Sequence, residues 1–328
     1  MAQTSAVTKP RRSALQRAFI SLARYRWLYI MLVPAIVYYI LFKFLPVLKL
    51  DIVFQRYNPA LENMGEKSPM MEPWYRNFQV FFSHRDFPML VRNTLVLAVL
   101  NILFFFPVPI ALALLLNEIT SGLYKKSVQS VLYLPHFISW TVLGSLFLMI
   151  FGPAPNGLVN NLLVSAGKAT IPFMESVEWF RPMYIIQIIW KEAGWGTIIY
   201  LAALSGVDEQ LYEAAVIDGA GRFKQLLHIT LPSIKSTIVV MIILRMGSFL
   251  DSGFDQIYLM LNSLNREVAT VFDTYIYDIG LKAIYRPAPG VSNYSYSATV
   301  GLFRSIISLI LVLGANRLAK LFGEEGVY

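Results

Sequence analysis

Residues 213–232 read EAAVIDGAGRFKQLLHITLP, a short island of polar and small residues between long apolar segments. Leu211, Ala214 and Ala215 stand at the i, i+3, i+4 spacing of one helix face, which leaves Glu213 pointing outward. The first half of the stretch therefore predicts a helix with a thin face of small side chains, which another backbone can approach closely.

The second half of the stretch predicts a turn and then a second helix. Gly219 and Gly221 favour the turn, because glycine adopts backbone angles that other residues resist. Apolar residues within 223–227 repeat the helical spacing, and Leu231-Pro232 is predicted to end that helix and to start the next segment. An ordinary surface hairpin between two membrane spans is the alternative that the residue types alone leave open.

The composition indicates a membrane protein. Of the 328 residues, 56% are hydrophobic and only 15% are charged, whereas soluble domains average about a quarter charged. Much of the net charge of +8 clusters near the ends of apolar segments, which is typical of membrane topology and not of nucleic-acid binding. The chain has no cysteine, which excludes disulfides, thiolate metal sites and cysteine nucleophiles.

The N-terminal segment 1–26 carries basic residues and no acidic one. The spacing of Leu15, Phe19 and Leu22 predicts a basic amphipathic helix on the inner membrane face. A cleavable signal peptide is the rival interpretation, but the small-residue cleavage site that it needs is missing. We therefore expect a cytoplasmic segment 1–26, followed by a transmembrane domain 27–328 that includes a loop at 205–232.

Six apolar segments are long enough to be membrane spans, namely 27–48, 91–117, 128–151, 181–204, 234–261 and 298–318. Roughly twenty residues at about 1.5 Å each cross a hydrocarbon core of about 30 Å. Pro135 is expected to bend the third span. The expected fold class is therefore an all-α membrane protein with six transmembrane helices.

Charge also predicts how the spans are oriented. The positive-inside rule places three connections outside, those at 49–90, 152–180 and 262–297. An even number of spans then leaves both termini in the cytoplasm, together with the loop 205–232.

Three charged residues fall near the middle of predicted spans, where charge is costly and therefore informative. Lys191 and Glu192 lie ten and eleven residues into the fourth span, and Arg245 lies eleven residues into the fifth. At about 1.5 Å per residue this is roughly 15 Å deep. A water-filled substrate pathway is one explanation, and mutual ion pairing between packed helices is the other.

Other residues extend this candidate pathway. Lys191, Arg245 and Arg304 would attract an acidic sugar in a low-dielectric cavity. Gln187 offers hydrogen bonds to sugar hydroxyls and Trp190 offers a stacking surface, although packed helices and membrane interfaces use the same residue types. The candidate pathway residues are Gln187, Trp190, Lys191, Glu192, Arg245, Asp251, Asp255 and Arg304.

The sequence lacks the common motifs of catalysis. No Gly-x4-Gly-Lys-Ser/Thr pattern occurs, so this chain is not expected to bind or hydrolyse ATP by itself. The three histidines are far apart and form no His-Glu-x-x-His zinc motif, and no Gly-x-Ser-x-Gly elbow occurs. A non-catalytic chain without a metal or cofactor of its own is expected.

The 213–232 stretch resembles the EAA loop of binding-protein-dependent ABC importer permeases. That loop has the spacing Glu-Ala-Ala, three residues, Gly, nine residues, Ile-x-Leu-Pro, and all seven fixed positions are present. The resemblance implies the type I importer permease fold, with the loop acting as a cytoplasmic coupling helix in a groove of a separate ATPase subunit. It assigns this contact to Glu213, Ala214, Ala215, Asp218, Gly219 and Arg222.

Other segments resemble permeases that import oligosaccharides and polysaccharide fragments, a group that includes aldouronate and alginate importers. They are 26–29, 77–82, 254–257, 273–275, 296–303 and 316–320. Within this group the resemblance is strongest to the first permease subunit of bacterial alginate importers, and it covers almost the whole chain.

This resemblance implies an assembly in the bacterial inner membrane, surrounded by lipid. A second homologous permease and two ATPase subunits, which bind ATP and Mg²⁺, are expected. A periplasmic or extracellular solute-binding protein is expected to deliver an oligosaccharide or polysaccharide, which the permeases move by alternating access. No nucleic acid is expected as a partner.

Two other classes of function stay open from the residues alone. A self-contained secondary transporter or channel for sugars would need an internal repeat and an ion-coupling pair, and no convincing repeat joins the two halves. A membrane enzyme of polysaccharide assembly would need a catalytic constellation that the sequence does not contain.

Overall fold

The computed structural model describes residues 24–251, 253–284, 287–321, 323 and 326. All regular elements in these ranges are helical, and one isolated β-bridge joins Gln55 to Met70. The all-α expectation is therefore confirmed. The predicted amphipathic helix in segment 1–26 lies outside the described residues except at its end, because the description begins at Arg24.

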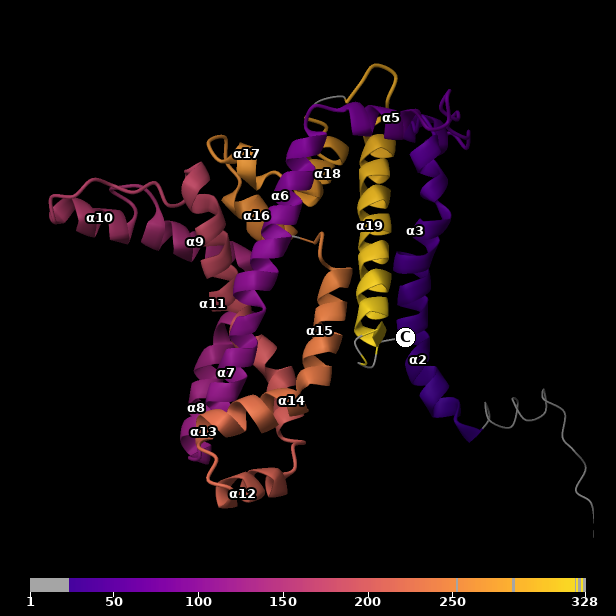
Figure 1. The fold of residues 1–328 in the computed structure, drawn as a ribbon. Helices are drawn as coiled ribbons and strands as arrows, with labels where there is room; N and C mark the ends of the chain where they lie inside the picture. The colour runs from indigo at the N-terminus through magenta and orange to yellow at the C-terminus, as the bar shows by residue number, and fades with distance from the viewer. Residues whose placement is uncertain (1–23, 252, 285–286, 322, 324–325, 327–328) are drawn as a thin grey trace, which may run out of the picture.

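The first predicted span is a helical rod that stands at the edge of the molecule (Figure 1). Its parts are α2 (Arg26–Tyr39), η1 (Ile40–Phe44), α3 (Leu45–Leu48) and η2 (Leu50–Phe54). The side chains of α2 are apolar in nearly every direction, and none of them is buried. Its η2 end packs against α19 (Asn293–Leu321), whereas the apolar surface of α2 stays uncovered and suits lipid or another subunit and not water.

The second and sixth predicted spans are also continuous. The second consists of α6 (Phe87–Leu100), η3 (Asn101–Phe105) and α7 (Pro107–Asn117), and the sixth is α19. α7 packs along α11 (Val177–Leu204), while α19 packs against α15 (Lys235–Gly247). These contacts place α11 and α15 inside the helix bundle, where their charged residues meet other helices.

The third predicted span is not one helix. α8 (Gly122–Tyr133) and η4 (Leu134–Phe137) are followed by α9 (Trp140–Phe151), which turns away by 100°. The prediction that Pro135 bends the span is confirmed, but the bend is a full break. Ser139 adopts extended angles and caps α9 by accepting a hydrogen bond from the Val142 N–H, so a new helix starts there.

The fifth predicted span is also interrupted, which corrects the expectation of one helix over 234–261. α15 ends at Gly247 and α16 (Phe254–Met260) begins seven residues later, and the described residues between them, 248–251 and 253, are not helical. Gly253 has φ +75°, a left-handed conformation that glycine adopts without strain. Asp251 therefore lies in the break and not on a helix, whereas Asp255 lies in the first turn of α16.

Three helical stretches are long and apolar enough to cross a membrane in the described part of the chain: Arg26–Phe54, Phe87–Asn117 and Asn293–Leu321. Two bent pairs, α8–η4 with α9 and the helices on either side of Ile234, raise the number to five if each is one span. α11 is not among them, because polar residues near its middle lower its hydropathy. Its 28 residues are nevertheless long enough to cross, so the count of six stays a prediction.

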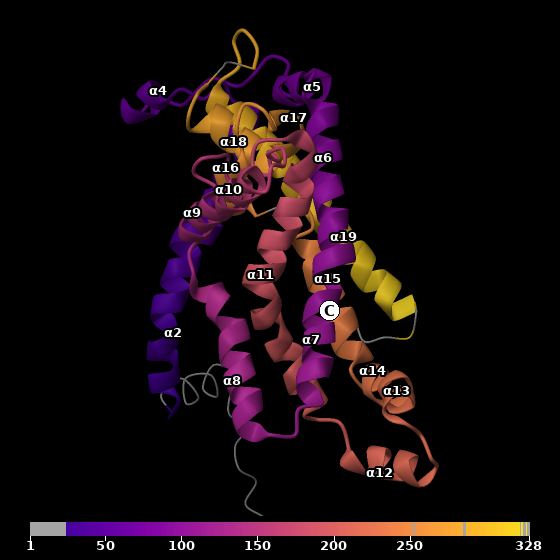
Figure 2. The ribbon, with the colours of Figure 1, turned by 90° about the vertical axis from the view of Figure 1, so that its left-hand side faces the viewer.

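The remaining helices gather at the two ends of the bundle (Figures 1 and 2). At one end are α4 (Pro59–Asn63), α5 (Arg76–Ser83), α10 (Leu158–Ser165), α17 (Arg266–Ala269) and α18 (Phe272–Gly280). At the other end are α12 (Glu209–Ile217), α13 (Arg222–Gln225), η5 (Leu226–Thr230) and α14 (Leu231–Ser233). The 213–232 stretch thus lies at the end opposite to the predicted outer connections.

Candidate functional site

The coupling segment, residues 205–232, protrudes from one end of the bundle (Figure 2). The Asp208 carboxylate caps α12 by accepting a hydrogen bond from the Gln210 N–H at 3.0 Å. No residue within the described α12 is buried, and the Ile217 side chain is 86% exposed. Glu213, as expected, faces solvent. Val216 and Phe223 in the same segment are also exposed, and a group of exposed apolar side chains is typical of a surface that meets a partner.

The predicted glycine turn is confirmed, and its hydrogen bonds show why it forms. The Ala220 N–H donates to the Ala215 carbonyl at 2.8 Å and the Gly219 N–H donates to the Val216 carbonyl at 3.0 Å. This pair of bonds ends α12 as a Schellman motif, whose central residue needs a left-handed conformation. Gly219 supplies it with φ +75°. Gly221 has φ −69° and starts the next helix, so it does not share that constraint.

The second helix of the segment continues further than predicted. α13, η5 and α14 follow one another without a gap to Ser233, and the break comes at Ile234, after which α15 is bent by 56°. Leu231-Pro232 therefore lies inside the helix and does not stop it. The π-turn immediately before Pro232 relaxes the hydrogen-bond ladder where proline has no N–H to donate.

An exposed ion pair ties this segment to the bundle. The Arg222 guanidinium lies 3.6 Å from the Glu118 carboxylate at the end of α7, and both side chains are more than half exposed. Such a pair contributes at most about 1 kcal/mol. Tyr212 and Thr230 add a hydrogen bond of 3.0 Å between α12 and η5. Few contacts hold α12, so it can move with a partner.

A partly buried charge cluster joins Lys191 and Glu192, near the middle of α11, to His136 in η4. One carboxylate oxygen of Glu192 is 2.7 Å from His136 Nδ1, and the other is 3.4 Å from Lys191 Nζ. Lys191 also donates to the backbone carbonyl of His136 at 2.6 Å, and only 7% of its side chain is exposed. Lys191 thus pairs with its neighbour Glu192 on the same helix, and its contact with another helix is the hydrogen bond to the His136 carbonyl.

Arg245 on α15 has a neutral partner. Its Nε and Nη2 donate to the side-chain oxygen of Asn101 at 3.1 and 2.5 Å, and its guanidinium lies 5.6 Å from the centre of the Phe105 ring. No carboxylate lies within ion-pair distance of Arg245 among the residues described. Its positive charge is therefore not cancelled by an anionic side chain.

A cavity of about 650 Å³ lies between α7, α11 and α15. Its wall includes Glu192, Trp195 and Arg245, with Phe105 and Ser248 nearby. Volumes of this size are usual for small-molecule sites. The structure thus brings Glu192 and Arg245 together at one cavity, as the pathway interpretation requires, whereas Lys191 lies behind the wall.

Two other pathway candidates have structural contacts. Gln187 is 1% exposed and lies 3.3 Å from the Gln256 amide, which also donates to the Tyr184 carbonyl. This is the polar contact between packed helices that the sequence left as the alternative. Trp190 is 42% exposed, packs edge-on to Phe147 and does not line the cavity.

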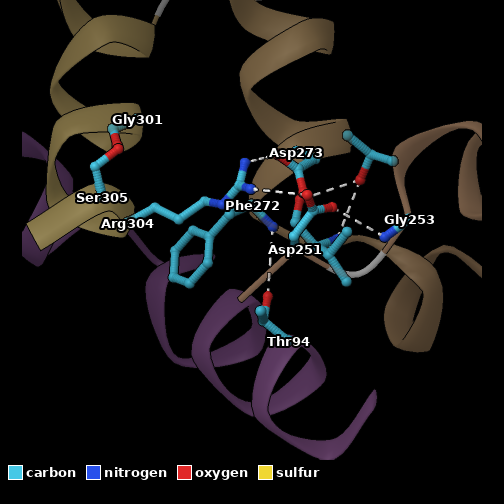
Figure 3. A network of polar contacts seen from close by, with 10 residues as sticks. Thr94, Asp251, Gly253, Phe272, Asp273, Gly301, Arg304 and Ser305 are labelled. Carbon is cyan, nitrogen blue, oxygen red and sulfur yellow. Dashed lines mark hydrogen bonds and ion pairs between the residues drawn. The ribbon is translucent and has the colours of Figure 1, made fainter. Parts of the chain in front are cut away.

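Arg304, Asp251 and Asp273 form a separate network where α18, α19 and the break in the fifth span meet (Figure 3). The Arg304 guanidinium forms an ion pair with Asp273 and lies 3.8 Å from Asp251, whose carboxylate also accepts from the Gly253 N–H at 3.3 Å. Arg304 and Asp251 are thus brought together, but neither of them lines the cavity that contains Glu192. Asp255 is exposed and belongs to neither group.

Two charged groups at the end of the bundle that carries the predicted outer connections have shifted pKa values. A hydrogen bond to the Tyr258 hydroxyl raises the pKa of Lys282 above its ordinary 10.5. Hydrogen bonds from Tyr57 first and from Lys49 second lower the pKa of Glu62 below its ordinary 4.5. Both groups are exposed to solvent, so they mark local contacts and not a buried site.

Sequence reasoning did not assign three residues that organise these sites. His136 was set aside because the histidines are far apart in the chain, and Asp273 was part of a resemblance only. Asn101 was considered only for hydrogen bonds to sugar hydroxyls or between packed helices, not as the partner of Arg245. A polar side chain inside an apolar segment was the available signal for Asn101 and His136. Their partners are 144 and 56 residues away, a separation that no local pattern reveals.

Comparison with known proteins assigns the fold to a family. The family described as "Binding-protein-dependent transport system inner membrane component" matches residues 105–324. The chain belongs to this permease family. The resemblance based on the EAA spacing and the expected type I permease fold are confirmed, and with its long apolar helices the permease is a multi-pass protein of the inner membrane.

Two relatives from Bacillus subtilis (strain 168) cover almost the whole permease. The permease described here is 50% identical over 313 residues to the polygalacturonan/rhamnogalacturonan transport system permease protein YteP. The match covers 95% of this chain and 94% of YteP. The permease is 48% identical over 310 residues to protein LplB, covering 94% and 93% of the two chains.

Two solved structures of bacterial ABC transporters contain chains with a similar fold. A bacterial ABC transporter involved in the import of the acidic polysaccharide alginate contains a chain with a TM-score of 0.80 and 36% identity, covering 93% of this permease and 98% of that chain. The alginate transporter in complex with an alginate pentasaccharide-bound periplasmic protein gives a TM-score of 0.81 and 36% identity, with 95% and 100% covered. The sugar-importer resemblance therefore extends over the fold.

Proposed function

We propose that this permease is one of two membrane-spanning subunits of an ATP-driven importer that carries fragments of an acidic polysaccharide into the cell, with both termini in the cytoplasm. YteP, the relative with 50% identity, is a polygalacturonan/rhamnogalacturonan transport system permease, and the structural neighbours belong to alginate importers. These polymers are rich in uronic acids, so a polyanionic sugar chain is the shared substrate class.

The observation that carries this proposal is the exposed α12 with its Schellman turn at Gly219. A helix that is held by few contacts, and that joins α11 to α15 through the chain, can transmit a partner's motion to both. Separate ATPase subunits would bind ATP and Mg²⁺ and would contact Glu213, Ala214, Ala215, Asp218, Gly219 and Arg222. The permease itself would carry out no chemical step.

The cavity between α7, α11 and α15 supports an anionic substrate. The Glu192 charge is balanced by Lys191, while the Arg245 side chain donates to the neutral Asn101 and has no carboxylate at ion-pair distance among the described residues. The charge left on the cavity wall is therefore positive, which favours a carboxylate in a low-dielectric setting. A second permease would complete the pathway, and a solute-binding protein would dock on the outer connections.

Reconstitution tests this function. The permease would be purified gently from its native membrane with its associated subunits and placed in proteoliposomes with the solute-binding protein, and uptake of labelled trigalacturonate would be measured. We expect a co-purifying second permease and ATPase, and uptake that needs internal ATP and Mg²⁺. Uptake that survives without ATP but collapses with an ionophore would contradict the proposal and favour a secondary transporter.

A further inference from the structure

We infer that His136 is a positioning residue for the substrate cavity: it holds the Glu192 carboxylate paired within the protein, so that the cavity admits an anionic sugar. This inference rests on the proposed function and deepens it. Nothing in the family likeness points to His136, which lies outside both the coupling segment and the predicted pathway residues.

The geometry around His136 joins three residues of one helical turn of α11. Its Nδ1 is 2.7 Å from Glu192, its carbonyl accepts from Lys191 at 2.6 Å, and its ring stacks on Trp195 with centroids 4.4 Å apart and planes inclined by 3°. Because an ionised carboxylate only accepts hydrogen bonds, Nδ1 is the donor. Glu192 and Trp195 both line the cavity, so one residue fixes two parts of its wall.

The helices that carry these residues are closely packed beside the cluster. A Cβ at Gly194 would collide with the Leu132 carbonyl, which shows that the end of α8 touches α11 directly. His136 follows in η4, at the 100° break between α8 and α9. The imidazole therefore contacts α11 from a short helix that directly follows the packed end of α8, and not from a long loop.

Electrostatics explains why this position matters for transport. The Glu192 side chain is 26% exposed and contributes to a cavity whose other ionic group is Arg245. Lys191 and His136 are the charged or titratable groups that contact the carboxylate among the described residues. Without the imidazole donor, one carboxylate oxygen would turn its charge toward the cavity and oppose a uronate.

Two variants separate the two contacts of the imidazole. His136→Phe keeps an aromatic ring against Trp195 but removes the donor to Glu192. His136→Asn places an amide donor near the position of Nδ1 but removes the ring. Leu134→Phe is the matched control, because Leu134 lies in the same short helix with 65% of its side chain exposed.

The experiment measures uptake by the complete reconstituted transporter with two probes of equal backbone, trigalacturonate and its methyl ester. We expect His136→Phe to raise the KM for trigalacturonate about tenfold while leaving that for the neutral ester within about twofold. His136→Asn and Leu134→Phe should keep both KM values near those of the unmodified transporter. In a Glu192→Gln background, His136→Phe should have no further effect.

Several results would overturn the inference. These are equal KM changes for the acidic and neutral probes, a His136→Asn variant as impaired as His136→Phe, or a full His136→Phe effect in the Glu192→Gln background. If His136→Phe prevents assembly, restored assembly in the double variant would support the pairing, and continued failure would contradict it. An unmodified transporter that imports neither probe would instead overturn the proposed function, and with it the role of His136.

Discussion

The coupling segment and the partly buried charge cluster are built in opposite ways. The turn in the coupling segment is made from backbone bonds between neighbours, Ala215 to Ala220, and its helix is exposed. The charge cluster joins side chains 56 residues apart, His136 and Glu192, and is largely shielded from solvent. A locally determined joint tolerates motion, whereas a packed cluster keeps one arrangement, and a transporter needs both.

The largest effect is expected at the glycine turn. Gly219→Val should lower uptake by about thirtyfold, because forcing a β-branched residue into a left-handed conformation costs about 2 kcal/mol or more. Gly221→Val is the matched control: an added Cβ meets no described atom within 4 Å at either glycine, but only Gly219 has a positive φ. Equal losses in the two variants would show that bulk, and not turn geometry, matters here.

Within the charge cluster, the next largest effect is expected at Lys191. Lys191→Met should lower the stability of the purified permease by about 2–3 kcal/mol, because it leaves the Glu192 carboxylate without its cation. Denaturant unfolding measures this change. Lys282→Met, at a lysine whose side chain is 41% exposed, should cost less than about 1 kcal/mol. A similar cost at both positions would argue against a tightly held cluster.

The Arg304 network predicts a smaller contrast. Asp273→Asn should destabilise the permease by about 1–2 kcal/mol, since Asp273 is 13% exposed and pairs closely with Arg304. Asp251→Asn should cost less than about 0.5 kcal/mol, since its carboxylate is 54% exposed and lies 3.8 Å away. Thermal unfolding of the two variants measures both losses. A larger loss of stability for Asp251→Asn than for Asp273→Asn would contradict this prediction and would show that the segment between α15 and α16 depends on Asp251.

The smallest effect is a pH dependence at the outer end. The pKa of Glu62 is lowered from 4.5 by Tyr57 and Lys49, so the folded state favours the ionised carboxylate. Its contribution to stability is present above pH 4.5 and is lost as the pH falls through the lower folded pKa. Glu62→Gln should remove this part of the acid sensitivity in melting curves between neutral and acid pH, and an unchanged acid profile would contradict the contact.

The sequence predicted features that depend on neighbouring residues. The glycine turn and the membrane class follow from local spacing and composition, and the spans at 27–48 and 91–117 were placed to within a few residues. The break in the third span was underestimated as a bend, and the break in the fifth span was missed. The reason is that the apolar pattern favours a continuous helix, whereas the Ser139 cap and the left-handed Gly253 start new helices. The partners of the charged residues within the spans required the fold: Asn101, the partner of Arg245, lies 144 residues away in the chain.

The proposed joint between permease and ATPase can be tested directly, because the chain contains no native cysteine. Ile217→Cys would place a single thiol on the tip of α12, where the native side chain is 86% exposed, and Leu162→Cys would place one on α10 at the opposite end. With a bifunctional crosslinker in native membranes, we predict that Ile217→Cys forms an adduct with an ATPase subunit, that its yield changes with ATP, and that Leu162→Cys forms none. An ATPase adduct from Leu162→Cys, or labelling of Ile217→Cys by an impermeant reagent applied from outside the cell, would contradict the account.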